Sequence, residues 1–123
     1  MQQYYIQDNK PASNSAKDLV PLVTDRILCV KVGKVIRENL YEMTRKYWKL
    51  RLERASKATH VLAIVNSEVV AVYIPEKWKY TEDSAHLGRI EFTGVEDAQS
   101  EYIGKSVRGL FGKYPGPTMY INM

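Results

Sequence analysis

The apolar positions of this chain form short β-branched runs, interrupted by one stretch with helical spacing. The runs cover residues 26–32, 60–65, 69–74, 89–93 and 118–122. Short runs rich in valine and isoleucine predict buried or half-buried strands. Between residues 35 and 56, apolar side chains instead recur every three or four positions, at Ile36, Leu40, Met43, Tyr47 and Leu50. That spacing predicts one long helix.

Turn-forming residues separate these elements. Asn66-Ser67-Glu68 connects the two central runs and predicts a tight hairpin, because asparagine tolerates a positive φ angle. Pro75 is expected to end the ladder of the second strand, since it cannot donate a hydrogen bond. Residues 96–111 are predicted to be a helix followed by a loop, which the Pro-Gly-Pro of residues 115–117 stops.

The order of elements predicts a single α+β domain over residues 19–123, with a curled, mainly antiparallel sheet and one long helix. Residues 1–18 are predicted to be a flexible leader. A length of 123 residues fits one hydrophobic core. Cys29 is the only cysteine, which excludes an intramolecular disulfide and favours a reducing, cytoplasmic compartment. The sequence predicts neither a signal peptide nor a membrane span.

The residue types that carry chemistry are sparse. His60 and His86 are the only histidines, and neither stands at a metal-ligand spacing from Cys29 or from a group of carboxylates. No Gly-x-Ser-x-Gly motif is present, and Gly104-Lys105-Ser106 lacks the earlier glycine of a phosphate-binding loop. The sequence therefore predicts no catalytic residue, no metal and no cofactor.

Charge is segregated along the chain. Residues 45–57 contain one acid, Glu53, against Arg45, Lys46, Lys49, Arg51, Arg54 and Lys57. Residues 82–101 contain one base, Arg89, against Glu82, Asp83, Glu91, Glu96, Asp97 and Glu101. The net charge is +4. A basic helix with interleaved aromatic residues is typical of a surface that binds a polyanion, and it is also typical of a solvated helix face.

Nucleic acid is the polyanion that this pattern favours. Lysine and arginine neutralise phosphates, and exposed aromatic rings stack on bases. The candidate nucleic-acid-binding residues are Arg45, Lys46, Lys49, Arg54, Trp48, Trp78, Tyr80, Lys105 and Arg108. The proposed ligand is DNA or RNA, with the basic helix on phosphates and an aromatic side chain on one or two bases.

Six blocks of the sequence together resemble a family of small bacterial domains for which no activity is established. The blocks are Leu40–Lys49, Val61–Val65, Val72–Trp78, Arg89–Gly94, Tyr102–Val107 and Tyr120–Asn122. The resemblance spans residues 20–123 and departs at two turns. Family members usually carry glycine in the hairpin turn, where this chain has Ser67-Glu68, and Asn-Pro before the last strand, where it has Gly116-Pro117.

Residues 61–78 are also similar to the central hairpin of PUA-like domains, which include the ASCH and EVE domains. This resemblance implies a curled sheet and an aromatic-lined pocket that reads RNA or modified bases. It would make Trp48, Trp78 and Tyr80 the walls of such a pocket, with Arg45 and Lys49 on phosphates. Lys105 and Arg108 would supply a second anion contact.

Two other functions remain open. Tyr102-Ile103-Gly104-Lys105-Ser106 resembles the second signature of the GIY-YIG nucleases, and Val72-Tyr73-Ile74 the first. A nuclease of this kind would use Tyr73 or Tyr102 with Arg108 and Glu91 around a metal ion. The third hypothesis is a protein-interaction module, whose basic helix meets an acidic protein partner or the acidic stretch of a second copy.

Overall fold

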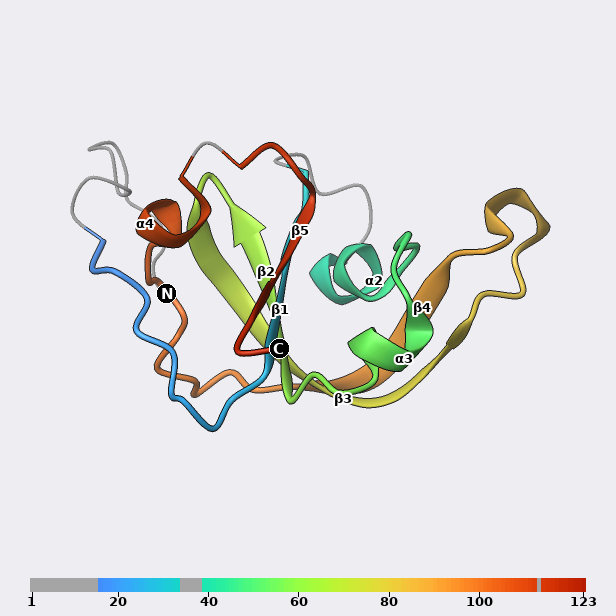
Figure 1. Ribbon diagram of the computed structural model, residues 1–123, viewed down its shortest axis with the longest axis horizontal. Helices are drawn as coiled ribbons and strands as arrows, with labels where there is room; N and C mark the ends of the chain where they lie inside the picture. Colours follow the sequence, from blue (N-terminus) through green and yellow to red (C-terminus); the bar gives the residue numbers. More distant parts are fainter. Residues whose placement is uncertain (1–15, 34–38, 113) are drawn as a thin grey trace.

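A computed structural model describes residues 16–33, 39–112 and 114–123 as an α+β fold around one open, mostly antiparallel sheet (Figure 1). The strands are β1 (Ile27–Lys31), β2 (His60–Val65), β3 (Glu68–Tyr80), β4 (Ile90–Glu96) and β5 (Thr118–Ile121). Their order across the sheet is β4-β3-β2-β1-β5. β1 and β2 run parallel, and the other neighbours are antiparallel. The predicted fold class is confirmed at this level.

The central hairpin is confirmed. Val65 and Glu68 pair across a two-residue turn, and Asn66 and Ser67 have φ angles of 52° and 64°. Two consecutive positive φ angles are the geometry of the type I′ turn, whose twist matches that of the flanking strands. Asparagine adopts this geometry readily, which explains how the turn forms without glycine.

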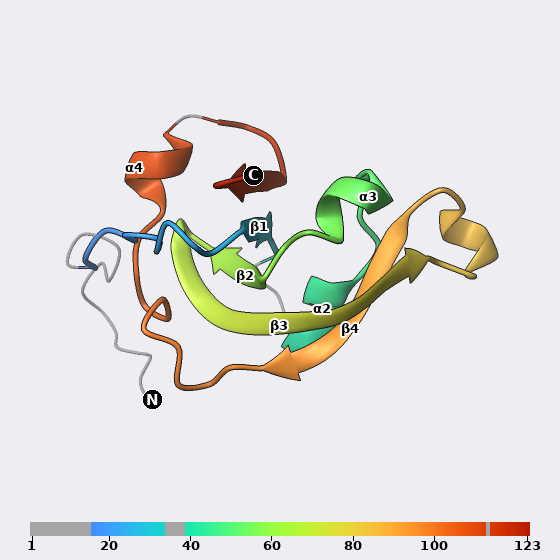
Figure 2. The ribbon, with the colours of Figure 1, turned by 60° about the horizontal axis from the view of Figure 1, so that its bottom comes forward.

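The prediction that Pro75 ends the second strand is wrong. β3 continues to Tyr80 and bends strongly along its length (Figure 2). Its first half pairs with β2 as far as Tyr73, and its second half pairs with β4. Pro75 lies beyond the last β2 partner, at a shift in the β4 register, where the missing N–H interrupts little pairing. Opposite it, a Cβ on Gly94 would clash with the carbonyl oxygen of Ile74, so glycine is required for the two strands to approach this closely.

The single long helix is also wrong. In the described part of residues 35–56, two short helices form, α2 (Leu40–Arg45) and α3 (Leu52–Ala55); Ile36 lies outside the described residues. The chain leaves α2 at Lys46 in an extended conformation. The backbone of Trp48 then exchanges two hydrogen bonds with Ile90 of β4, of 3.0 and 2.9 Å. Pairing with the edge of the sheet therefore replaces the middle of the predicted helix.

Apolar side chains pack on both faces of the sheet. One cluster contains Ile27, Cys29, Leu62 and Val72, and it is covered by Leu19, Tyr102, Val107 and the short helix α4 (Arg108–Phe111). The other contains Leu28, Val30, Val61, Tyr73 and Phe92, and it is covered by Leu40, Tyr41, Trp48 and Leu50 from the α2–α3 segment, with Trp78 and Tyr120. Alternate residues of each strand point to opposite faces, which explains why consecutive apolar residues are all buried.

The remaining segments connect these layers. Between β3 and β4, a short 3-10 helix covers Ser84–His86. Residues 97–107 form turns that lead into α4, so the order predicted for residues 96–111, a helix followed by a loop, is reversed. The amide of Ser106 donates to the carbonyl of Lys17, so the chain is tied to the domain from there onward. Residues 1–15 of the predicted leader lie outside the described residues. In the ranges that the structure describes, no helix is long and apolar enough to cross a membrane.

Candidate nucleic-acid interface

Two of the predicted phosphate contacts are engaged within the domain. The Arg45 guanidinium donates through Nε to the carbonyl of Phe92 at 2.9 Å. Its Nη1 and Nη2 lie 3.1 and 3.0 Å from the carboxylates of Glu42 and Glu91. Lys46 Nζ lies 3.0 Å from the same Glu42 carboxylate, and these cations hold the pKa of Glu42 below its usual range. Only 13% of the Arg45 side chain is exposed, so Arg45 ties α2 to β4 instead of facing solvent.

The cations that follow are exposed. Lys49, Arg51, Arg54 and Lys57, which we call the α3 basic face, are all exposed and flank or lie on α3. None of them forms an ion pair with a carboxylate of the described residues. Arg51 is the N-cap residue of α3, Arg54 lies within the helix and Lys57 follows two residues after its end, so the three cations lie in one short stretch of chain.

One member of the α3 basic face is held in place by an aromatic ring. The Arg54 guanidinium carbon lies 4.1 Å from the ring centroid of Tyr120 in β5. Its Nη2 also donates to the carbonyl of Met123 at 3.3 Å. A guanidinium stacked on a ring keeps its charge and loses side-chain freedom before any ligand arrives. The Arg54 side chain is therefore partly ordered by contacts within the domain.

The predicted aromatic platform is mostly packed into the domain. Trp48 is half-buried, and its Nε1 donates to the carbonyl of Thr44 at 2.7 Å. The Trp78 ring packs 4.9 Å from that of Phe92, and its Nε1 is buried. Tyr80 is 57% exposed. Tyr80 pairs with Ile90 of β4, and Ile90 pairs on its other side with Trp48, the neighbour of Lys49. The backbone of Tyr80 therefore lies two strand spacings, about 10 Å, from that of Trp48.

Lys105 and Arg108 lie with the other side of the sheet. Lys105 Nζ donates to the carbonyl of Glu101 at 3.1 Å, and Arg108 is exposed at the start of α4. Lys105 lies two residues before and Arg108 one residue after Val107, which belongs to the cluster opposite the α2–α3 segment. The predicted residues therefore divide between two faces of the sheet. Figure 1 shows α4, which begins at Arg108, on one side of the sheet and α3 on the other, so Lys105 and Arg108 do not join the α3 basic face.

Arg26 is a cation that the sequence prediction missed. It is exposed, and its amide donates to Oγ1 of Thr59 at 2.9 Å, two residues after Lys57. The parallel pairing of β1 with β2 brings the start of β1 to this position. No local pattern marks that contact, because it joins residues far apart in the sequence. Arg51 and Lys57, in contrast to Arg26, belong to the basic stretch that the sequence shows directly.

The nuclease constellation is not gathered at one place. Tyr73 is 2% exposed in the cluster beneath the α2–α3 segment, and burial raises its pKa to about 12. Tyr102 belongs to the cluster on the opposite face. Glu91 is paired with Arg45. Among the described residues, no group of three or more histidine, cysteine, aspartate or glutamate side chains is arranged to hold a metal ion.

Comparisons with protein-family models, with curated proteins and with solved structures found no match.

Proposed function

We propose that this domain binds nucleic acid without catalysing a reaction, and that the α3 basic face is the phosphate-binding surface. The observation that carries the proposal is the exposure of Lys49, Arg51, Arg54 and Lys57 with no carboxylate partner among the described residues. Cations that are not neutralised by an aspartate or glutamate side chain retain their full charge for phosphates, and each phosphate contact releases a counterion. Arg45 and Lys46, in contrast, are paired with carboxylates of the domain, so in this proposal they position α2 and do not bind phosphate.

Base contact, in this proposal, comes from Tyr80. It is the exposed ring among the three aromatic candidates, and stacking of one base on such a ring contributes about 1–3 kcal/mol. Stacking requires an unpaired base, so single strands are expected to bind more tightly than duplexes of equal charge density. The resemblance to PUA-like domains supports RNA, or a modified base, as the ligand class.

Affinity for a single-stranded oligonucleotide tests the proposal with a pair of matched variants. Lys49→Gln with Lys57→Gln removes two charges from the α3 basic face. Lys77→Gln with Lys79→Gln removes two exposed charges from β3, on the sheet face opposite to that of Trp78. Both variants have the same net charge, so general electrostatic attraction falls equally in the two.

The proposal predicts that the α3 variant binds a labelled RNA or DNA strand at least tenfold more weakly than the wild type. The β3 variant should stay within about threefold of the wild type. Fluorescence anisotropy at about 50 mM salt measures both affinities. Equal losses in the two variants would show that binding follows net charge alone, and the absence of wild-type binding to any DNA or RNA strand would remove the proposal.

A further inference from the structure

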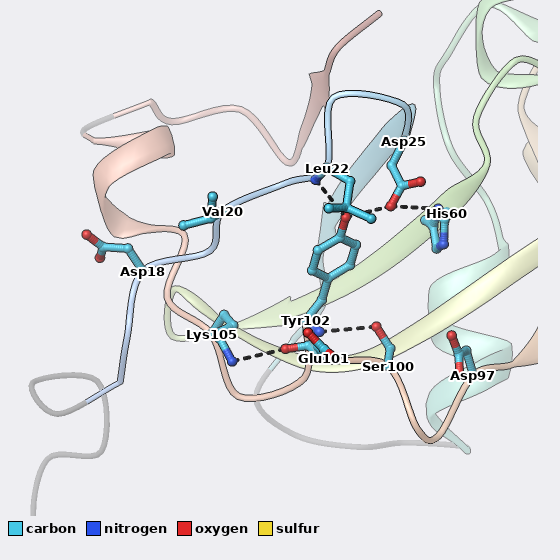
Figure 3. Close-up of a pocket in the computed structure, with 10 residues that line it drawn as sticks. All are labelled: Asp18, Val20, Leu22, Asp25, His60, Asp97, Ser100, Glu101, Tyr102 and Lys105. Atoms are coloured by element: carbon cyan, nitrogen blue, oxygen red, sulfur yellow. Dashed lines mark hydrogen bonds and ion pairs between the residues drawn. The ribbon is translucent and has the colours of Figure 1, made fainter.

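A cavity of about 420 Å³ opens beside Tyr102, which belongs to the cluster on the sheet face opposite to the α2–α3 segment (Figure 3). It lies between residues 18–25, the first residue of β2, and residues 97–105. The lining residues that carry charge are Asp18, Asp25, Asp97, Glu101 and Lys105. Four carboxylates against one ammonium group make this cavity negative, although the whole chain has a net charge of +4. We call it the acidic pocket.

The polar side chains at the floor of the acidic pocket interact with one another. The Tyr102 hydroxyl donates to Oδ2 of Asp25 at 2.5 Å and accepts from the amide of Leu22 at 3.0 Å. His60 Nδ1 lies 3.8 Å from the same Asp25 oxygen. This network fixes the shape of the cavity and occupies Asp25. The carboxylates of Asp18, Asp97 and Glu101 form no ion pair with a cation of the described residues and remain for a ligand.

Aliphatic side chains stand exposed along one edge of the acidic pocket. Val20, Leu22 and Val23 are 77%, 63% and 89% exposed, and the first two also line the cavity. A row of exposed aliphatic residues beside charged groups is typical of a surface that another protein covers. The occupant therefore has to supply positive charge and apolar contact together.

We propose that the acidic pocket and its aliphatic edge bind the α3 basic face of a second copy of this chain. The two surfaces have complementary charge, and each has little opposite charge of its own. The Arg54–Tyr120 stack gives the basic surface an apolar component as well. The two surfaces lie over opposite clusters of the sheet, as Tyr102 belongs to one cluster and Tyr120 packs against the other.

This placement determines the form of the assembly. A contact between two different surfaces of the same chain is head-to-tail, so an open assembly keeps one free pocket at one end and one free basic face at the other. Such contacts extend into chains, or into a ring where the rotation closes. One consequence rests on the proposed function. A nucleic acid and a second copy would compete for the α3 basic face, so adding nucleic acid would separate the copies.

Sedimentation velocity of the purified chain, with no nucleic acid present, tests this proposal. The expected result at about 0.1 M salt is an average mass that rises with protein concentration, and a monomer at about 1 M salt, where charges are screened beyond about 3 Å. Asp97→Asn with Glu101→Gln should weaken association at least tenfold. Glu76→Gln with Glu82→Gln, which removes two exposed carboxylates outside the acidic pocket, should leave it unchanged.

Three results would overturn the proposal. One is a wild-type monomer at every concentration in low salt. Another is association that survives in the Asp97→Asn, Glu101→Gln variant, and the third is association that survives in the Lys49→Gln, Lys57→Gln variant. The first pair of substitutions leaves the α3 basic face intact, so its affinity for nucleic acid should equal or exceed that of the wild type. Loss of self-association and loss of nucleic-acid binding are therefore measured separately.

Discussion

Replacing Arg45 by methionine distinguishes a structural cation from a binding one. Methionine keeps much of the aliphatic stem and removes the guanidinium, which bonds the carbonyl of Phe92 and the carboxylates of Glu42 and Glu91. The Arg45 and Glu91 side chains are 13% and 11% exposed. Breaking a buried ion pair from one side costs about 3–5 kcal/mol, because the remaining charge is left uncompensated. The pair keeps some contact with water, so we expect the free energy of unfolding to fall by about 3 kcal/mol, the lower end of that range.

Urea denaturation followed by tryptophan fluorescence measures this change. Trp48 and Trp78 both pack against the cluster beside Arg45, so their emission reports loss of this packing. Lys49→Met is the matched control, because Lys49 is exposed and lies only four residues further along the sequence. Its effect should stay within about 0.5 kcal/mol.

A double variant isolates the cause. When Arg45→Met is combined with Glu91→Met, no buried charge is left without its partner, so the double variant should be more stable than Arg45→Met alone. A loss below about 1 kcal/mol in Arg45→Met, the range of an exposed ion pair, would refute the structural role. A double variant less stable than the single one would show that the uncompensated charge of Glu91 is not the source of the loss.

Two further predictions concern stability. Gly94→Ala should lower the free energy of unfolding, measured by urea denaturation, by about 1–3 kcal/mol, because its Cβ would meet the backbone of Ile74. Gly109→Ala is the control and should be neutral or stabilising, because no atom lies within 4 Å of its Cβ. Equal effects of the two substitutions would contradict the close approach of the strands at Gly94. Burial raises the pKa of the Cys29 thiol from 9.0 to about 12, so this thiol stabilises the fold below pH 9 and that stability is lost as the pH rises toward 12. Between pH 8 and 10.5 the wild type should lose about 2 kcal/mol more than Cys29→Ala under reducing conditions, and parallel pH profiles would contradict this.

The strands were predictable because their signals are local. The runs at residues 60–65 and 69–74 are β-branched, and Asn66 between them supports a tight turn, so the hairpin follows from adjacent residues. The end of β3 was not predictable in this way. Pro75 lies beyond the last β2 partner and pairs with Gly94, far along the chain, which lets β4 approach closely.

The helix failed for a similar reason. Leu40, Met43, Tyr47 and Leu50 have the spacing of one helix face, and Leu40 and Leu50 do pack against the cluster under α2 and α3. The backbone of Trp48, however, pairs with Ile90 of β4. A periodicity analysis counts side chains and cannot detect a backbone partner at a distant position.

The candidate site was predictable as a region and not as a set of residues. Six cations within residues 45–57 indicated a basic surface, but nothing local separates Arg45 from Lys49. The difference arises because β4 brings Glu91 to Arg45 and brings no carboxylate to Lys49. The acidic pocket was missed because its lining comes from three segments that only the fold assembles.

The salt dependence of nucleic-acid binding tests the central claim most directly. If the four cations of the α3 basic face each contact a phosphate, the logarithm of the association constant should fall against the logarithm of salt concentration with a slope of about −2.8 for a single strand. Lys49→Gln with Lys57→Gln should bring the slope to about −1.4, while Lys77→Gln with Lys79→Gln should leave it near −2.8. A wild-type slope near zero, or the same slope in all three proteins, would contradict phosphate binding by the α3 basic face.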